Sequence, residues 1–222
     1  MLRGVIFDVD GTLAASNEAH ARSWVDTLSE TGYSVPFDVV WPMIGMGGDK
    51  LLPSVIGIES ESPEGKKLSR RRWEIFETKY LPHVRPTRGA RALVERLKND
   101  GLSIVVASSA GGNELGALLD AAGVRDLMEE TTSSSDADDS KPDPDIVKAA
   151  VRKSGLDPDE LIMIGDTPYD VQASIGANVK LVAFLSGGWT KEELSGAIAI
   201  YDDPADLLHW YEKSPFFIAD AS

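Results

Sequence analysis

The stretch that decides the fold of this chain is Gly4-Val5-Ile6-Phe7-Asp8-Val9-Asp10-Gly11-Thr12-Leu13. Its apolar residues 4–7, bounded by a turn at Gly11-Thr12, are typical of a buried strand. Asp8 and Asp10 therefore lie where that strand ends, and ligands bind at the carboxyl ends of strands in an open α/β sheet. Carboxylates in that position can bind Mg²⁺, act as a nucleophile or move a proton.

Apolar runs alternate with helical patterns along the rest of the chain. Strands are predicted at residues 2–7, 102–107, 161–164 and 179–185, with a weaker one at 197–201. Apolar residues at helical spacing lie between them, for example over 90–97 and 115–122. This alternation predicts an α/β fold with a three-layer, Rossmann-like core built on a parallel sheet. The Ser- and Asp-rich residues 131–139 are interpreted as a loop.

The first two predicted strands are unusually far apart. About ninety residues separate Phe7 from Leu102, whereas a single crossover helix needs far fewer. The additional residues contain two sets of apolar side chains at helical spacing. One set is Ala21, Trp24, Val25 and Leu28, and the other is Trp73, Phe76 and Tyr80. We therefore expect a core of residues 1–13 and 86–222 with an inserted α-helical cap of residues 14–85. Within that cap, Arg70-Arg71-Arg72 is interpreted as a solvated helix face.

Composition excludes several classes of function. The 222 residues carry a formal net charge of −14, which argues against a general nucleic-acid binder. The absence of cysteine excludes Cys-ligated zinc and a cysteine nucleophile. No segment resembles a signal peptide or a membrane span, so we expect a cytoplasmic protein, a monomer or a homodimer, that does not bind membranes. An anionic ligand would need a locally positive site, supplied by a metal ion, a lysine or backbone N–H groups.

Four segments place polar side chains at the carboxyl ends of predicted strands or in the loops there. They are Asp8-Val9-Asp10-Gly11-Thr12, Val105-Val106-Ala107-Ser108-Ser109, Ser140-Lys141-Pro142-Asp143-Pro144 and Gly165-Asp166-Thr167-Pro168-Tyr169-Asp170. Their order resembles the four signature motifs of the haloacid dehalogenase superfamily, over nearly the whole chain. The segment Asp8–Trp24, with His20 inside it, resembles the helical-cap subgroup that includes phosphoglycolate phosphatase and β-phosphoglucomutase.

The resemblance implies a role for each residue that would meet the phosphoryl group. Asp8 would be the nucleophile that forms an aspartyl-phosphate, and Asp10 would be the general acid and then the base. Ser108 and the backbone N–H of Ser109 would bind the transferring phosphoryl group. Lys141 would neutralise its charge and hold Asp8. Because Asp10 has other carboxylates near it in the sequence, we expect its pKa to be raised.

The resemblance also implies a magnesium site. Asp8, the Asp10 carbonyl and Asp166 would bind Mg²⁺, with Asp170 supporting that shell, and oxygen ligands of this kind suit the ion. Plainer interpretations stay open at two positions. Asp170 is also suited to cap a helix, and Ser108 is also suited to be an ordinary N-cap.

Candidate substrate residues lie in the predicted cap. His20 lies four residues before Trp24 on the first cap helix, and either contacts substrate or is a partly buried structural histidine. The loop Gly45-Met46-Gly47-Gly48-Asp49-Lys50 has glycines that allow close backbone approach to a ligand. We expect Gly45, Met46, Gly47 and Lys50 to face the leaving group.

These features predict a Mg²⁺-dependent phosphatase of small phosphate monoesters. One alternative is a sugar-phosphate mutase resembling β-phosphoglucomutase, but the cap loop lacks the arginine of those mutases and Gly165 precedes Asp166 where they tend to have Glu. A 2-haloacid dehalogenase is disfavoured because that branch lacks the second aspartate, here Asp10. A non-catalytic phosphate-ligand binding protein on the same fold is the remaining alternative.

Overall fold

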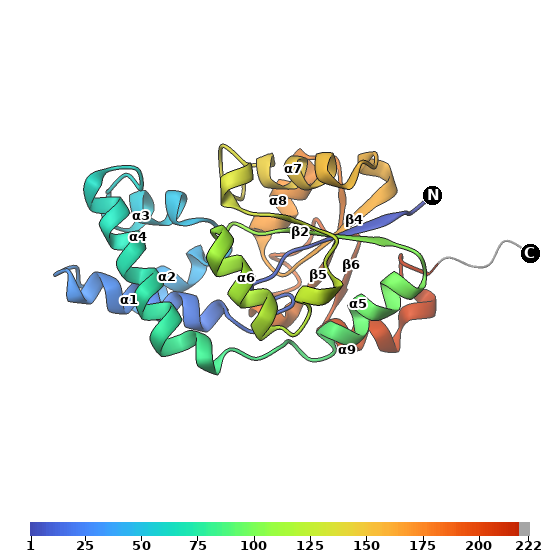
Figure 1. The fold of residues 1–222 in the computed structure, drawn as a ribbon, viewed down its shortest axis with the longest axis horizontal. Helices are drawn as coiled ribbons and strands as arrows, with labels where there is room; N and C mark the ends of the chain where they lie inside the picture. The colour runs from blue at the N-terminus through green and yellow to red at the C-terminus, as the bar shows by residue number, and fades with distance from the viewer. Residues whose placement is uncertain (218–222) are drawn as a thin grey trace, which may run out of the picture.

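The computed structural model describes residues 1–217, so residues 218–222 of the predicted core lie outside the described part. A six-stranded parallel sheet with the order β3-β2-β1-β4-β5-β6 forms its centre (Figure 1). The strands are β1 (Gly4–Phe7), β2 (Ser103–Ala107), β3 (Glu130–Thr132), β4 (Leu161–Gly165), β5 (Lys180–Phe184) and β6 (Ala199–Tyr201).

The predicted fold class is confirmed, and so are the predicted strands apart from shifts of one or two residues at their ends. One strand was missed, because β3 overlaps the start of residues 131–139, and the interpretation of that segment as a loop is wrong at Thr131 and Thr132. Its sequence is Glu-Thr-Thr, a three-residue edge strand with no apolar run to mark it. Only its pairing with β2 reveals it as a strand.

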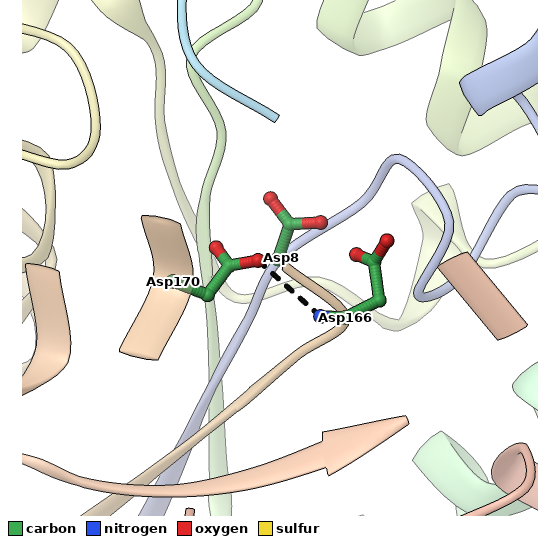
Figure 2. A group of neighbouring side chains, drawn as sticks. All are labelled: Asp8, Asp166 and Asp170. Atoms are coloured by element: carbon green, nitrogen blue, oxygen red, sulfur yellow. Dashed lines mark hydrogen bonds between the residues drawn. The ribbon is translucent and has the colours of Figure 1, made fainter. Parts of the chain in front are cut away.

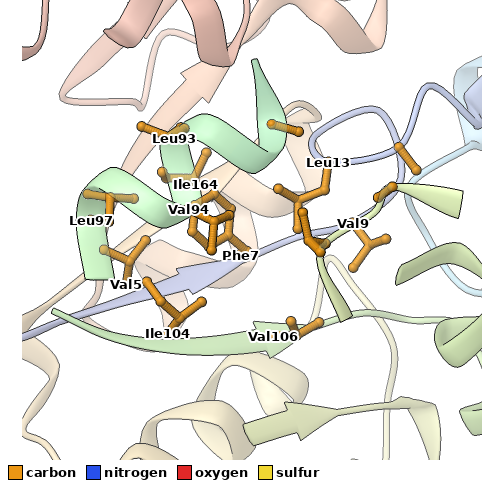
Figure 3. Packing of buried hydrophobic residues seen from close by; sticks show 14 of the residues in the cluster. Val5, Phe7, Val9, Leu13, Leu93, Val94, Leu97, Ile104, Val106 and Ile164 are labelled. Carbon is orange, nitrogen blue, oxygen red and sulfur yellow. The ribbon is translucent and has the colours of Figure 1, made fainter. Parts of the chain in front are cut away.

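Helices cover both faces of the sheet because successive strand side chains point in opposite directions. Val5 and Phe7 of β1 belong to one apolar cluster, while Ile6 belongs to the other. The first cluster is covered by the apolar side of α5 (Ala90–Asn99), as Figure 3 shows, and also by α6 (Gly112–Ala121) and α9 (Pro204–His209). The second is covered by α7 (Asp145–Ser154) and α8 (Pro168–Gly176). Burial on both sides explains why the central strands are continuous apolar runs.

The residues between β1 and α5 fold into a separate group of helices beside the sheet (Figure 1). They are α1 (Asn17–Glu30), α2 (Phe37–Val40), α3 (Gly48–Ile56) and α4 (Pro63–Ile75). An apolar cluster of their own, which includes Trp24 and Leu28, packs inside this group. The chain leaves and returns side by side, since Ala14 bridges to Pro86 and the N–H of Ala15 donates to the carbonyl of Arg85 at 2.9 Å. The cap boundaries at 14 and 85 stay a prediction.

No helix within residues 1–217 combines the length and the apolar character that crossing a bilayer requires.

Candidate active site

Strand register brings three of the predicted motifs to one edge of the sheet. Phe7 pairs with Val106 on one side and with Ile164 on the other. The residues that follow these strands are therefore neighbours in space, and the N–H of Asp8 donates to the carbonyl of Ile164 at 2.9 Å. This edge is the carboxyl end of a parallel sheet, where ligands bind in such folds.

Lys141 joins the third motif to the first and the fourth. Its ammonium group forms ion pairs with Asp8 and, at 2.7 Å, with Asp170. The lysine side chain is only 1% exposed. Although burial lowers the pKa of Lys141, the nearby Asp170 and Asp8 carboxylates raise it above its usual range. Lys141 is therefore a fixed positive charge in the floor of the site.

The carboxyl groups of Asp8, Asp166 and Asp170 gather beyond the ends of β1 and β4 (Figure 2). Each offers an oxygen within 4.8 Å of the others. Burial raises the pKa of Asp8 to about 7, opposed by Lys141 and assisted by Asp170 and Asp10. Burial and the charges of Asp8 and Asp170 also raise the pKa of Asp166 well above its usual range. The three carboxyl groups therefore have less positive charge near them than would be needed to balance them when ionised.

The donor set fits a hard divalent cation. With all three carboxylates ionised, one ammonium would leave two negative charges for a cation to compensate, and oxygen ligands are the ones that Mg²⁺ prefers. Asp170 is the most committed of the three, because its Oδ2 accepts from the N–H and the hydroxyl of Thr167 at 3.0 and 2.7 Å and its Oδ1 pairs with Lys141. Asp170 thus completes the capping box of α8, whose N-cap is Thr167, and contributes to the carboxyl cluster as well.

Asp10 faces away from this carboxylate cluster and toward α1. Its Oδ1 accepts from the hydroxyl of Ser16 and contacts His20 Nε2 at 2.6 Å. The sequence-based expectation of a raised pKa is wrong. Burial raises the pKa of Asp10, but His20, Ser16 and Arg72 together lower it below the usual value. The neighbours that decide this pKa are donors and a cation rather than the other acids.

His20 is held by contacts from other helical residues of the insertion and from Asp10 at the sheet edge. Its ring stacks on Phe76 with centroids 4.3 Å apart, and its Nδ1 contacts the Arg72 guanidinium. Because arginine has only donors, Nδ1 must accept, so Nε2 carries the hydrogen and donates to Asp10. Arg72 in turn pairs with Glu114 of α6.

Arg72 corrects the interpretation of Arg70-Arg71-Arg72 as a solvated helix face. Its side chain is only 11% exposed and lies over Phe76 as well as against His20. Arg71 behaves as expected, pairing with Glu30 and Glu74 at the surface. Three adjacent arginines point in different directions around a helix, so a run of letters could not identify the one that turns inward.

The second motif contributes two serine side chains at the same edge. The Oγ of Ser108 accepts from the N–H of Ala110 at 3.1 Å, and Ser108 is 1% exposed. The Oγ of Ser109 is buried with no hydrogen-bond partner in residues 1–217. A buried hydroxyl without a partner is an unsatisfied group that a bound ligand can complete.

The loop of residues 45–50, in the helical insertion, packs directly on residues of the third and fourth motifs. Gly45 has a φ of +107°, and a Cβ there would come within 2.6 Å of the Thr167 side chain. A Cβ on Gly47 would come within 2.3 Å of Ser140 Oγ. The glycines are therefore needed for close approach to the core itself. Lys50 forms ion pairs with Asp139 at 2.7 Å and Asp143 at 2.9 Å.

A cavity of about 1110 Å³ lies between this loop and the sheet edge. The structure brings most of the predicted site residues to its wall, which are Asp8, Asp10, His20, Gly45, Met46, Gly47, Lys50 and Ser109. Lys141, Asp166, Asp170 and Ser108 lie behind that wall, in contact with it or adjacent to it in the chain.

Sequence reasoning missed several residues that hold the site together. Thr12 donates to Asp166 Oδ1 at 2.8 Å, and Asn17 donates to Asp166 Oδ2 at 2.8 Å. Ser16 was detectable, since it precedes His20 by four residues and shares its helical face. Glu114 and Arg72 were not, because they meet across 42 positions of sequence.

The parallel α/β fold, with acidic side chains at the carboxyl edge of its sheet and a helical insertion beside them, places the chain in a class of hydrolases. The chain belongs to the haloacid dehalogenase-like hydrolase family, whose model matches residues 5–184. The predicted family and enzyme class are thereby confirmed.

Individual relatives extend this likeness. The chain is 30% identical to a phosphoglycolate phosphatase of Rhodospirillum rubrum, over 95% of this chain and 91% of that protein. It is 36% identical to the chloroplastic protein SUPPRESSOR OF QUENCHING 1 of Arabidopsis thaliana, over 81% of this chain but only 17% of that protein's length. A crystal structure of a hydrolase from Pseudomonas syringae superposes with a TM-score of 0.88 at 30% identity, covering 95% of this chain and 98% of its own.

Proposed function

We propose that this chain is a Mg²⁺-dependent phosphatase that hydrolyses small phosphate monoesters through an aspartyl-phosphate at Asp8. The observation that carries the proposal is the convergence of Asp8, Lys141 and Asp166 at one buried sheet edge. Phosphoryl transfer needs positioning and charge neutralisation more than it needs covalent chemistry from the protein. The site offers both, and it lies beneath a cavity of small-molecule size.

In the first half-reaction, an Asp8 oxygen attacks phosphorus and the bond from phosphorus to the leaving oxygen breaks. Ser108 and Ser109 bind the phosphoryl oxygens, and Lys141 balances their charge and orients Asp8. Asp8, Asp166 and the Asp10 carbonyl would hold Mg²⁺, with Asp170 supporting them, and the ion would supply further charge neutralisation. The leaving oxygen takes its proton from Asp10.

In the second half-reaction, Asp10 accepts a proton from water as that water attacks the aspartyl-phosphate, releasing inorganic phosphate and restoring Asp8. The lowered pKa of Asp10 leaves its carboxylate ionised, as this step requires. For the first step Asp10 must carry a proton, and a bound phosphoryl dianion raises its pKa because it is a like charge. His20 Nε2 stays within 2.6 Å to hold the carboxyl in place.

The experiment is a panel of phosphate esters with and without Mg²⁺, with phosphoglycolate first because a relative carries that name. Wild type should release phosphate only with the metal. Asp8→Asn should lose on the order of 10³-fold or more of kcat, since the nucleophile is gone. The control is Asp202→Asn, an exposed carboxylate outside the cavity wall, which should keep wild-type turnover.

Metal-independent turnover, or turnover that survives Asp8→Asn, would contradict the mechanism. The mutase alternative has its own readout. Supplied with β-glucose 1-phosphate, a mutase makes glucose 6-phosphate before free phosphate, whereas the proposed phosphatase makes glucose and phosphate. A cytoplasmic location and a monomeric or dimeric state stay predictions.

A further inference from the structure

Asn17 is a buried polar residue at the start of α1, and the proposed mechanism gives it no role. It is 6% exposed. Its Nδ2 donates to Asp166 Oδ2 at 2.8 Å and to the carbonyl of Gly187 at 3.3 Å. Both partners can only accept, so the amide nitrogen must face them. The Oδ1 is then left buried with no hydrogen-bond partner in the described chain.

Asp166 has very little freedom to turn. Thr12 donates to its Oδ1 at 2.8 Å, while Asn17 donates to its Oδ2. Glycine backbone closes in around Oδ2, since a Cβ on Gly187 would come within 1.9 Å of it and a Cβ on Gly11 within 2.1 Å. Asn17 is thus the side-chain donor to the oxygen that the glycines enclose.

The same turn of α1 also holds Asp10. Ser16 and His20 contact Asp10 Oδ1 from positions on either side of Asn17. One helical turn therefore sets the orientation of two different acids, one from the first motif and one from the fourth. This turn begins the helical insertion, so the position of the insertion is linked directly to Asp166.

We propose that Asn17 is a positioning residue for the cation site, holding the Asp166 carboxylate in the orientation that a divalent cation needs. The inference rests on the proposed Mg²⁺-dependent function. The carboxylate alone could rotate about its last torsion, which is broad for this side chain. Hydrogen bonds to ligating carboxylates fix that rotation, and removing them typically costs 10–100-fold in metal affinity. The free Oδ1 stays available to a donor that arrives with the cation or the substrate.

The test is calorimetric titration of the metal-free protein with Mg²⁺ alone. Asn17→Ala should weaken the Mg²⁺ affinity by about tenfold or more, with little change in the melting temperature of the metal-free protein. Asn17→Ser is the second variant, because serine suits a helix start but is too short to reach Asp166. Asn99→Ala is the matched control, an exposed asparagine at the far end of α5, and should bind Mg²⁺ like wild type.

Kinetics supply an independent readout. In the Asn17 variants the Mg²⁺ concentration for half-maximal activity should rise, while kcat at saturating Mg²⁺ and KM for the ester stay near wild type. A lowered melting temperature with unchanged Mg²⁺ affinity would make Asn17 purely structural and overturn the inference alone. If wild type itself binds no Mg²⁺, both the inference and the proposed function fail.

Discussion

The Asp166 carboxylate fits beside the start of α1 only because residue 187 has no side-chain carbon. Gly187 lies against it so closely that even a methyl group has no space, because the added Cβ would be 1.9 Å from Asp166 Oδ2. The atoms that this Cβ would meet belong to the Asp166 side chain, which hydrogen bonds from Thr12 and Asn17 hold in place. The carboxylate and the glycine are therefore a matched pair, although they are separated by 21 positions in the sequence.

Gly187→Ala should destabilise the protein by roughly 1–3 kcal/mol through overpacking, and it should weaken Mg²⁺ binding by displacing Asp166. Urea unfolding and calorimetry measure the two effects. Gly112→Ala is the control, since nothing lies within 4 Å of its added Cβ, and it should be neutral or slightly stabilising. Wild-type Mg²⁺ affinity in Gly187→Ala would show that Asp166 is not confined as described.

At the scale of elements, the start of α3 is fastened to the loop that precedes α7. Lys50 pairs with Asp139 and Asp143, and Asp49 accepts from the N–H of Ser140 at 3.3 Å. These contacts flank Lys141 in the sequence and join the helical insertion to the core. A role for Lys50 in substrate binding stays a prediction. Its two ion pairs indicate another role, which is to join the helical insertion to the loop before α7.

Lys50→Met should raise KM two- to fivefold or so for all phosphate esters alike, because partly exposed ion pairs contribute up to about 1 kcal/mol each. The measurement compares p-nitrophenyl phosphate with the best substrate of the panel. Lys79→Met is the control, since it breaks a pair with Asp26 inside the helical insertion. A KM increase confined to the best substrate would instead show that Lys50 contributes to substrate recognition.

At the scale of the whole molecule, a net charge of −14 surrounds a site that is proposed to bind an anionic phosphate ester. The buried Lys141 and the carboxyl cluster of Asp8, Asp166 and Asp170 lie behind the cavity. Under the proposed function, Mg²⁺ bound at this cluster compensates its carboxylates, so cation binding should be coupled to global stability.

Mg²⁺ at 100 times its dissociation constant should stabilise wild type by about 2.7 kcal/mol, which is roughly 5–10 °C in melting temperature for a chain of this size. Thermal unfolding with and without the metal measures it. Asp166→Asn keeps the shape of the side chain but removes one anionic ligand, so most of the shift should disappear. An equal shift in this variant would place the cation elsewhere.

Much of the fold could be predicted because the central strands bury both faces. Val5, Ile6 and Phe7 must all be apolar in a sheet covered on both sides, which produces a run that can be recognised in one dimension. The edge strand Glu130–Thr132 has no such requirement and left no signal. Parallel strands end at one edge, so the proximity of Asp8 to Asp166 followed from topology alone.

The sequence by itself determined the apolar strands, the helical residues inserted between the first two of them and the four motifs near strand ends, because local periodicity and the spacing of strands are properties of the chain. Only the tertiary structure decided which groups surround each acid. Asp10 acquired a histidine and an arginine as neighbours, and Asp166 acquired Asn17. A pKa and a carboxylate orientation depend on distances of a few ångströms between distant segments, and no pattern of adjacent residues contains those distances.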